Sequence, residues 1–186
     1  MINDPAADIA VPLIAEFEGF RDKPYVDQGG TFTIGFGFTV LEDGRYVTAD
    51  TPPMSRDEAY ARLSSMVATT AKNVRGMVYH PGITNNAIAA LTSFAFNEGT
   101  NALRKSTLLM ALNQGRLDEA ANGFLAWIYV KGLRDHGLAN RRTKERLLFL
   151  TPDNDDPVTE TPQQELTADE LNQKVLNGDI SEVIPT

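Results

Sequence analysis

The amino-acid sequence predicts an α+β fold in which a small antiparallel sheet comes first and a larger group of helices follows. Two observations lead to this prediction. The stretch from Thr31 to Phe38 is rich in β-branched and aromatic residues, which favour strands. After Ser55, apolar residues recur at helical spacing in several segments that are divided by glycines, as far as Leu150. With 186 residues, 42% of them hydrophobic, the chain is long enough for one sizeable domain with a real core.

The first expected element is a short helix over Leu13 to Phe17. It should begin near Pro12, because proline suits the first turn of a helix. Glu18 then stands at the end of this helix, and Gly19 follows as the residue that ends it, since glycine takes the left-handed conformation at little cost. The apolar run over residues 9–15 is too short for a secretory signal or a membrane span. We therefore expect no membrane-spanning segment here.

The second expected element is a small sheet. Asp27 lies in a glycine-rich turn, and Thr33 lies in the extended segment that follows it. Asp43-Gly44 between two further extended segments is a hairpin signal, so we expect a sheet of about three strands. This sheet would form one wall of a cleft, with Glu18 reaching the cleft from a helix end and Asp27 and Thr33 from the sheet.

Helices are expected over the rest of the domain. Ser55 and Glu58 form a capping box that opens a long helix ending at Gly76, and Thr84 begins another helix. Further helix-length patterns run from Ser106 to Asn113, from Asp118 to Tyr129 and from Leu138 to Leu150. Trp127, within the second of these, is expected in the core rather than on a sugar-binding surface.

Composition excludes several classes of function. The chain has no cysteine, so it has neither disulfides nor a thiolate metal site, and its two histidines, His80 and His136, make a histidine-based metal site improbable. Of its 25 acidic and 17 basic residues, nine acids and Lys174 follow residue 150, which leaves 16 of each sign in residues 1–150. A domain without net charge or a basic stripe argues against nucleic-acid binding. We expect no metal and no organic cofactor.

The chain after residue 150 differs from what precedes it. Residues 151–166 begin with TPDNDDPVTETP, and so many prolines and acids indicate a linker that cannot bury a core. Residues 167–186 should contain one short amphipathic helix, opened by a capping box of Thr167 and Glu170. Because so short a helix is marginal in water, we expect residues 163–184 to dock on a protein partner or on the chain's own domain.

Two carboxyl groups and a hydroxyl make up the candidate site. Glycoside hydrolysis needs one protonated carboxyl to donate to the leaving oxygen and one ionised carboxyl to activate water or attack the sugar. Glu18 and Asp27 supply the two carboxyls, and Thr33 supplies a hydroxyl that can hold the attacking water. Residue types and spacing alone fit equally a solvated helix-end Glu, an Asp that forms a turn and an ordinary strand Thr.

A resemblance to a known family favours the enzymatic interpretation. The residues that carry it are Glu18-Gly19, Tyr25 with Asp27, Thr33-Ile34-Gly35-Phe36-Gly37, and later Phe94 to Gly99, Ser106 to Leu109, Trp127, Gly137 to Arg142 and Glu145-Arg146. These motifs, in this order over about residues 7 to 150, resemble phage-type lysozymes of glycoside hydrolase family 24. The resemblance implies a lysozyme-like fold over residues 1–150, with a small sheet lobe and a larger helical lobe around a catalytic cleft.

The resemblance also implies an activity and a set of roles. The activity is hydrolysis of the β-1,4 bond between N-acetylmuramic acid and N-acetylglucosamine in peptidoglycan strands, usually with inversion. Glu18 is then the general acid, while Asp27 and Thr33 manage the water. Arg141 matches the family's partner of the catalytic Glu. An arginine near the start of a helix is unfavourable beside the positive end of the helix dipole, and a carboxylate partner would explain its place.

The sequence departs from the family at two positions. Phe38 stands where the family commonly has a histidine that pairs with an acid, which should alter stability and pH response more than catalysis. Glu98 stands where the family often has a small or apolar residue, and an acid near the cleft would make Glu18 hold its proton more tightly if it lay close enough. Arg142 and Arg146 are expected on the solvated face of their helix.

Two alternative functions remain open from the sequence. One is a lytic transglycosylase acting on the same bond, in which no water attacks. The other is a wall-binding or virion structural protein with a lysozyme fold. Without a recognisable secretory signal, we expect the chain to be made in a host cytoplasm and to act on the wall after release, by delivery in a particle or by export.

Overall fold

The computed structural model describes residues 4–27 and 29–153. The linker and helix expected after residue 153, and the proposed docking segment over residues 163–184, lie outside the described residues. Met1–Asn154 form one compact unit of the chain.

Helix α1, Pro5–Glu18, begins earlier than the sequence predicts. Asp4 caps it, because its Oδ1 accepts a hydrogen bond from the backbone N–H of Ala6 at 3.0 Å, and Pro5 takes the first helical position. Pro12 therefore lies inside the helix, and the expected start at this proline is wrong. The expected end is confirmed, since Glu18 is the last helical residue and Gly19 follows with φ 67°.

The sheet near the N-terminus has two strands, β1 (Arg21–Val26) and β2 (Phe32–Gly35), which pair antiparallel. Tyr25 lies opposite Thr33 in this register. The expected third strand is wrong: the Asp43-Gly44 turn forms, but only one isolated bridge, between Val40 and Tyr46, joins its two sides. The Asp43 side chain accepts hydrogen bonds from the Arg45 backbone and guanidinium instead, which stabilises a compact turn rather than a ladder.

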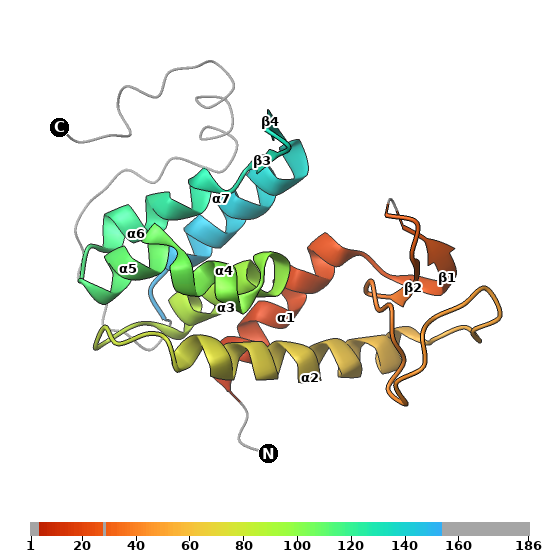
Figure 1. Ribbon diagram of the computed structural model, residues 1–186. Helices are drawn as coiled ribbons and strands as arrows, with labels where there is room; N and C mark the ends of the chain where they lie inside the picture. The colour runs from red at the N-terminus through yellow and green to blue at the C-terminus, as the bar shows by residue number, and fades with distance from the viewer. Residues whose placement is uncertain (1–3, 28, 154–186) are drawn as a thin grey trace. The chain divides into compact units, whose positions relative to one another are not determined.

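Helix α2, Arg56–Arg75, connects the sheet to the other helices. The capping box predicted at its start is present, with the Ser55 hydroxyl and the Glu58 carboxylate each bonded to the other's backbone N–H. Its 20 residues correspond to a length of about 30 Å. Figure 1 shows α2 passing beneath the other helices, with the β1–β2 sheet beside its N-terminal end.

Helix α3, Asn85–Glu98, is the central helix and packs against α1, α2 and α7. Every residue from Ala87 to Ala95 is buried. Thr84 caps the helix as the sequence predicts, through a hydrogen bond from the Ala87 N–H to its hydroxyl. The Asp153 carboxylate accepts the remaining N–H groups of the first turn, those of Asn85 at 2.7 Å and Asn86 at 2.9 Å. The start of α3 is therefore held both by the residue directly before it, Thr84, and by Asp153, which follows the last helix.

The remaining elements are short, apart from the last helix. They are α4 (Thr100–Lys105), α5 (Thr107–Asn113), α6 (Leu117–Gly123), the 3-10 helix η1 (Phe124–Ala126), β3 (Tyr129–Val130), β4 (Leu133–Arg134) and α7 (His136–Leu150). The single helix expected from Asp118 to Tyr129 is wrong. A Cβ at Gly123 would lie 2.9 Å from the Cβ of Leu108, so the chain packs very closely there, and the α-helix tightens into η1 directly afterwards. Lys131 and Gly132 then take positive φ and form the β3–β4 turn.

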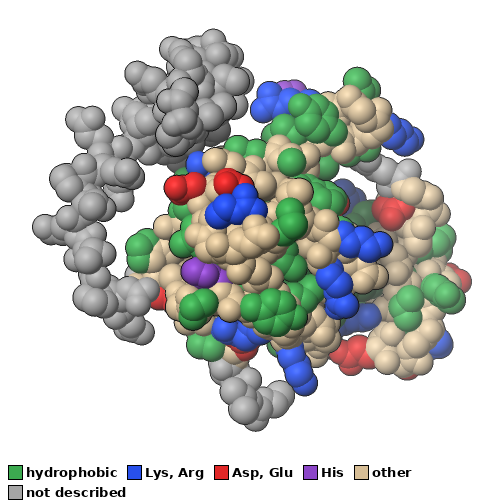
Figure 2. Space-filling view, turned by 60° about the vertical axis from the view of Figure 1, so that its left-hand side comes forward, with side chains coloured by type: hydrophobic (Ala, Val, Ile, Leu, Met, Phe, Trp, Pro, Cys, Tyr) green, Lys and Arg blue, Asp and Glu red, His purple; other side chains and the backbone are tan. Residues whose placement is uncertain are grey.

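The core lies within the helical part. Phe94 of α3 stacks edge-on against Phe124 and Trp127, with ring centroids 5.8 Å and 5.1 Å apart. Trp127 is half-buried and packs against the core, as expected from the sequence. On the surface shown in Figure 2, Lys and Arg side chains stand among hydrophobic and uncharged ones. In the described part of the chain, no helix is both long and apolar enough to cross a membrane.

Candidate active site

Glu18 reaches a cleft from the end of α1. Gly19 ends the helix at once, since its N–H still bonds to the Ala15 carbonyl while its positive φ turns the chain away towards β1. The Glu18 side chain is 26% exposed, and its Oε1 accepts a hydrogen bond from Nη1 of Arg141 at 2.8 Å. The helix end and the guanidinium together hold this carboxyl group in one place.

The cleft has a volume of about 610 Å³ and is open to solvent. Its walls come from the end of α1, the segment after β2, the middle of α2 and the end of α3. The lining residues are Glu18, Phe36, Gly37, Phe38, Thr39, Val40, Arg62, Ser65, Met66, Thr69, Thr70, Ala95 and Phe96. Among these described residues, Glu18 is the only acid and Arg62 the only base. A single carboxyl group thus faces a cleft whose other described lining residues, apart from Arg62, are apolar or uncharged.

Arg62 braces the segment after β2 against α2. One of its Nη2 hydrogens bonds to the Val40 carbonyl, and its guanidinium lies 4.4 Å from the centre of the Phe38 ring. Its Nη1 is buried and has no hydrogen-bond partner among the described residues. Phe38, which stands in place of the family's histidine, is thus buried under an arginine. Its expected effect on stability and pH response stays a prediction.

Asp27 and Thr33 lie on the β1–β2 hairpin. Asp27 forms the turn: its Oδ1 accepts from the Thr31 N–H at 2.8 Å and its carbonyl accepts from the Gly30 N–H at 3.1 Å. Thr33 is only 3% exposed, and its hydroxyl donates to the Tyr25 carbonyl at 3.4 Å. Neither side chain lines the cleft with Glu18, and no hydrogen bond or ion pair among residues 4–27 and 29–153 joins them to it. The hairpin fixes both groups independently of Glu18.

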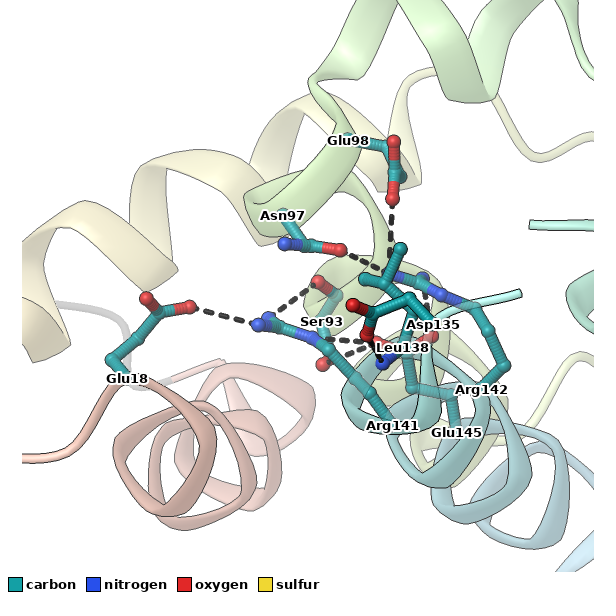
Figure 3. Close-up of polar contacts among 9 residues, drawn as sticks. All are labelled: Glu18, Ser93, Asn97, Glu98, Asp135, Leu138, Arg141, Arg142 and Glu145. Carbon is teal, nitrogen blue, oxygen red and sulfur yellow. Dashed lines mark hydrogen bonds and ion pairs between the residues drawn. The ribbon is translucent and has the colours of Figure 1, made fainter. Parts of the chain in front are cut away.

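Behind Glu18 lies a set of charged side chains, which we call the buried charge cluster: Arg141, Arg142 and Glu145 of α7 (Figure 3). Glu145 accepts three hydrogen bonds, from Nε of Arg141 at 3.2 Å, from Nη1 of Arg142 at 2.6 Å and from the Ser93 hydroxyl at 2.7 Å. Asp135 caps α7 through the Leu138 N–H at 2.8 Å and so fixes the helix that carries the cluster.

The expectation that Arg142 lies on a solvated face is wrong. Its side chain is fully buried, lies 4.7 Å from the centre of the Phe94 ring, and bonds to Asn97 and to Glu98, the latter at 3.3 Å. Burial lowers the pKa of Arg142. Glu98 therefore directs its carboxylate to Arg142, and it does not line the cleft. Glu98 could act directly on Glu18 only in close contact, and no hydrogen bond or ion pair joins the two side chains in the described part of the chain.

Burial also raises the pKa of Glu145 above the usual value for a glutamate, while the two guanidinium groups and the Ser93 hydroxyl act in the opposite direction. Each Glu145 oxygen accepts from a donor, which is the arrangement of an ionised carboxylate. The sequence holds a signal for this cluster in the helical period of α7. Traced back from the buried Phe149 at a period of 3.6 residues, the inward face of α7 passes through Glu145 and then Arg142 and Arg141.

Comparison with known proteins decides the family. A family model described as phage lysozyme matches residues 15–145, which is more than half of the 186 residues. The chain belongs to the phage lysozyme family. Its predicted lysozyme-like fold is confirmed by a solved phage lysozyme-type structure, the endolysin from Escherichia coli O157:H7 phage FAHEc1. That structure superposes with a TM-score of 0.69 at 28% identity, over 81% of this chain and 93% of the other.

Two further phage lysozyme relatives are informative. An endolysin of Bacillus phage B103 is 36% identical over 156 residues, an alignment that covers 81% of this chain and 56% of the relative. The chain thus spans about half the length of the Bacillus phage endolysins that it matches. The muramidase domain of SpmX from Asticaccaulis excentricus is 35% identical with a TM-score of 0.63, over 77% of this chain and 96% of that domain.

A metal site would need several acidic or histidine side chains close together. Among residues 4–27 and 29–153, no three His, Asp or Glu side chains are grouped so that they could hold a metal ion.

Proposed function

We propose that this phage lysozyme relative is a muramidase that hydrolyses the β-1,4 bond between N-acetylmuramic acid and N-acetylglucosamine in peptidoglycan, with inversion. The observation that carries the proposal is the position of Glu18. It is the only acid among the described residues of a 610 Å³ cleft, and Arg141 holds it at a helix end. The relatives described above, an endolysin and a muramidase domain, support the same substrate.

In the proposed reaction, Glu18 donates its proton to the glycosidic oxygen while the bond from this oxygen to the anomeric carbon breaks. A water molecule forms the new bond to the anomeric carbon from the opposite face of the sugar. Asp27 takes the proton that the water loses, and Thr33 helps to place that water. One water is consumed, and the two carboxyl groups exchange their protons with solvent before the next cycle. The peptidoglycan strand would lie along the cleft that Glu18 lines.

The biological role that we propose is degradation of the cell wall for host lysis, after the protein is released to the wall. Several relatives are endolysins, and some of these are SAR-endolysins, which supports this role. No partner of the tail segment over residues 163–184 is proposed beyond the docking expected from its sequence.

A lytic transglycosylase is the second candidate, because one observation favours it. Asp27 and Thr33 do not line the cleft with Glu18 in the described structure, and a transglycosylase needs no residue that activates water. The two reactions leave different products: hydrolysis gives a reducing end, and transglycosylation gives a 1,6-anhydro end.

The test is loss of turbidity of purified peptidoglycan, followed by mass analysis of the products. Glu18→Gln removes the proposed acid, and Glu16→Gln is a matched control two residues earlier on α1, where the side chain is exposed and pairs with Lys144. We expect clearing by the wild type and by Glu16→Gln but not by Glu18→Gln, with reducing ends among the products. Clearing by Glu18→Gln would overturn the role of Glu18. Binding without cleavage by every variant would favour a wall-binding protein.

A further inference from the structure

The buried charge cluster does not balance its own charge. Arg141 is 5% exposed and Arg142 and Glu145 are fully buried, so α7 places two cations and one anion out of water. Burying an unbalanced charge is costly unless a partner neutralises it. Two half-buried carboxyl groups border the cluster: Glu18 next to Arg141, and Glu98 next to Arg142, with side chains 26% and 25% exposed. These two decide the net charge of the group.

The balance has a consequence for Glu18. With Glu98 and Glu145 ionised, the two guanidinium groups are already neutralised, and Glu18 completes a neutral group only when it carries its proton. Two further charged groups lie outside this set of five. Lys144 of α7 pairs with Glu16, and Arg62 of α2 lines the same cleft as Glu18 and adds a positive charge there. Arg62 is present in every variant compared below, so it does not alter the differences between them. The segment over residues 36–40 adds no charged group.

The geometry shows how Glu145 acts on Glu18 through Arg141. All three nitrogens of the Arg141 guanidinium are engaged: Nη1 with Glu18, Nε with Glu145, and Nη2 with the Ser93 carbonyl at 3.2 Å. Figure 3 shows Glu18 and Glu145 on opposite sides of this guanidinium. Ser93 contributes twice, because its hydroxyl also donates to Glu145. The guanidinium cannot rotate without breaking its contacts to α3 and to Glu145.

We propose that Glu145 is a positioning residue for the reaction: by binding and neutralising Arg141, it lets this arginine hold Glu18 in the cleft while Glu18 keeps the proton that it must donate. An arginine beside a carboxyl group ordinarily favours loss of the proton. The carboxylate on the far side of Arg141 offsets this effect. The role in catalysis rests on the proposed muramidase function, whereas the effect on the Glu18 proton does not.

The test compares Glu145→Gln with the wild type by two readouts. The first is the pH dependence of peptidoglycan clearing. Without the Glu145 charge, only Glu98 offsets the positive charges of the two arginines. Glu18, next to Arg141, then loses its proton more readily. We expect the alkaline limb of the profile to move to lower pH, so that the ratio of the rate at pH 5 to the rate at pH 7 rises by about an order of magnitude.

The second readout follows the Glu18 carboxyl carbon by NMR in protein labelled with 13C-glutamate, with the signal assigned by its absence in Glu18→Gln. This titration needs no substrate. It should move to lower pH in Glu145→Gln even if the protein cleaved no peptidoglycan, which separates failure of this proposal from failure of the proposed function. Cleavage that is intact while the Glu18 titration does not move would overturn the proposal alone.

Three variants control for the loss of buried contacts. Ser93→Ala removes one hydrogen bond from Glu145 and keeps every charge, so the alkaline limb should stay in place. Glu119→Gln removes a carboxylate from an exposed i,i+3 pair on α6 and should change neither readout. Glu98→Gln removes a half-buried carboxylate, and because it acts through Arg142 it should move both readouts in the same direction as Glu145→Gln, but less far.

Glu98→Gln also keeps the proposal testable if Glu145→Gln does not fold. A folded Glu145→Gln with unmoved readouts overturns the proposal. So does an unfolded Glu145→Gln together with a Glu98→Gln whose titration of Glu18 matches the wild type.

Discussion

Glu18 and Arg141 form an ion pair of 2.8 Å between Oε1 and Nη1, although 123 positions of the chain separate them. The pair joins the end of the first helix to the inward face of the last. Arg141 in turn bonds to the central helix α3 through the Ser93 carbonyl. The carboxyl group at the cleft is therefore held by contacts that exist only when these three helices have assembled.

Replacing Arg141 by Gln should act in the direction opposite to the loss of Glu145. Without the guanidinium, Glu18 keeps its proton to higher pH, so the alkaline limb of the pH–rate profile should move to higher pH. The change also leaves Glu145 buried with one fewer cation, and we expect a loss of about 3–5 kcal/mol in the free energy of unfolding. Denaturant unfolding and clearing assays at several pH values measure both effects.

Lys144→Gln is the control for this prediction, because Lys144 lies on the same helix in a partly exposed pair with Glu16. It should cost less than about 1 kcal/mol. Equal losses for the two variants would contradict a special role for the buried position.

Truncating Phe38 should destabilise the fold. Its ring is 4% exposed, carries the Arg62 guanidinium on one face, and lies so close to Gly35 that a Cβ there would be 2.8 Å from the ring. We expect Phe38→Ala to cost about 3–5 kcal/mol, because it leaves a cavity and removes the contact of Arg62. Thermal and denaturant unfolding measure the loss. Tyr46→Ala, at a side chain that is 76% exposed, should stay within about 0.5 kcal/mol of the wild type.

Stability at acid pH should depend on Asp4. A bidentate contact with Arg75 holds the pKa of Asp4 below its usual value, and the contact with the Ala6 N–H lowers it further. A carboxyl group whose pKa is lower in the folded than in the unfolded state binds fewer protons when folded. Its stabilisation is complete above the unfolded pKa of about 3.9 and is lost as the pH falls through the folded pKa.

Asp4→Asn tests this, since asparagine can still cap α1 but cannot form the ion pair. The melting temperature of the variant should lie below that of the wild type at pH 6 to 7, and the difference should shrink as the pH falls below about 4. A difference that stays constant down to pH 2 would show that the lost stability does not come from the Asp4 charge.

Residues 151–153 should matter for stability although the chain after them is expected to be dispensable. Asp153 binds the first two N–H groups of α3, and the Asn86 side chain donates to the Thr151 and Pro152 carbonyls. We expect a chain that ends after residue 153 to melt as the wild type does, and one that ends after residue 150 to lose about 1 kcal/mol or more. Asp153→Ala in the full chain should reproduce most of that loss. If the longer truncated chain were also destabilised, the tail would contribute to the domain.

Much of this structure could be predicted because its signals are local. Capping boxes and N-cap residues stand next to the helices that they start, so Ser55 and Thr84 marked α2 and α3 correctly. Glu18 and Gly19 likewise mark the end of α1 in sequence. Arg141 was placed as the partner of Glu18 by family resemblance and by the helix dipole, and the two side chains are in contact. Their roles in catalysis remain predictions.

The features that could not be predicted depend on distant parts of the chain. The sequence predicts a solvated face for Arg142 because a charged residue usually lies there. In the interior, Glu145, Asn97 and Glu98 bind its two Nη atoms, while its buried Nε has no hydrogen-bond partner among the described residues. The end of α6 depends on the packing of Gly123 against Leu108, which no local pattern reveals. The start of α1 was placed at Pro12 because proline is common in first turns, whereas Pro5 and Asp4 supply a better start.

The two ends of α3 are bound by one continuous piece of chain. Arg142 bonds to Asn97 and Glu98 at its C-terminal end, and Asp153 bonds to Asn85 and Asn86 at its N-terminal end. The segment over residues 142–153 therefore runs antiparallel to the central helix α3, and its length must match the distance between the two ends of α3. Adding or removing one residue within the helical part of this segment would turn one anchor by about 100° relative to the other. Substitutions in this segment should be tolerated more easily than insertions or deletions.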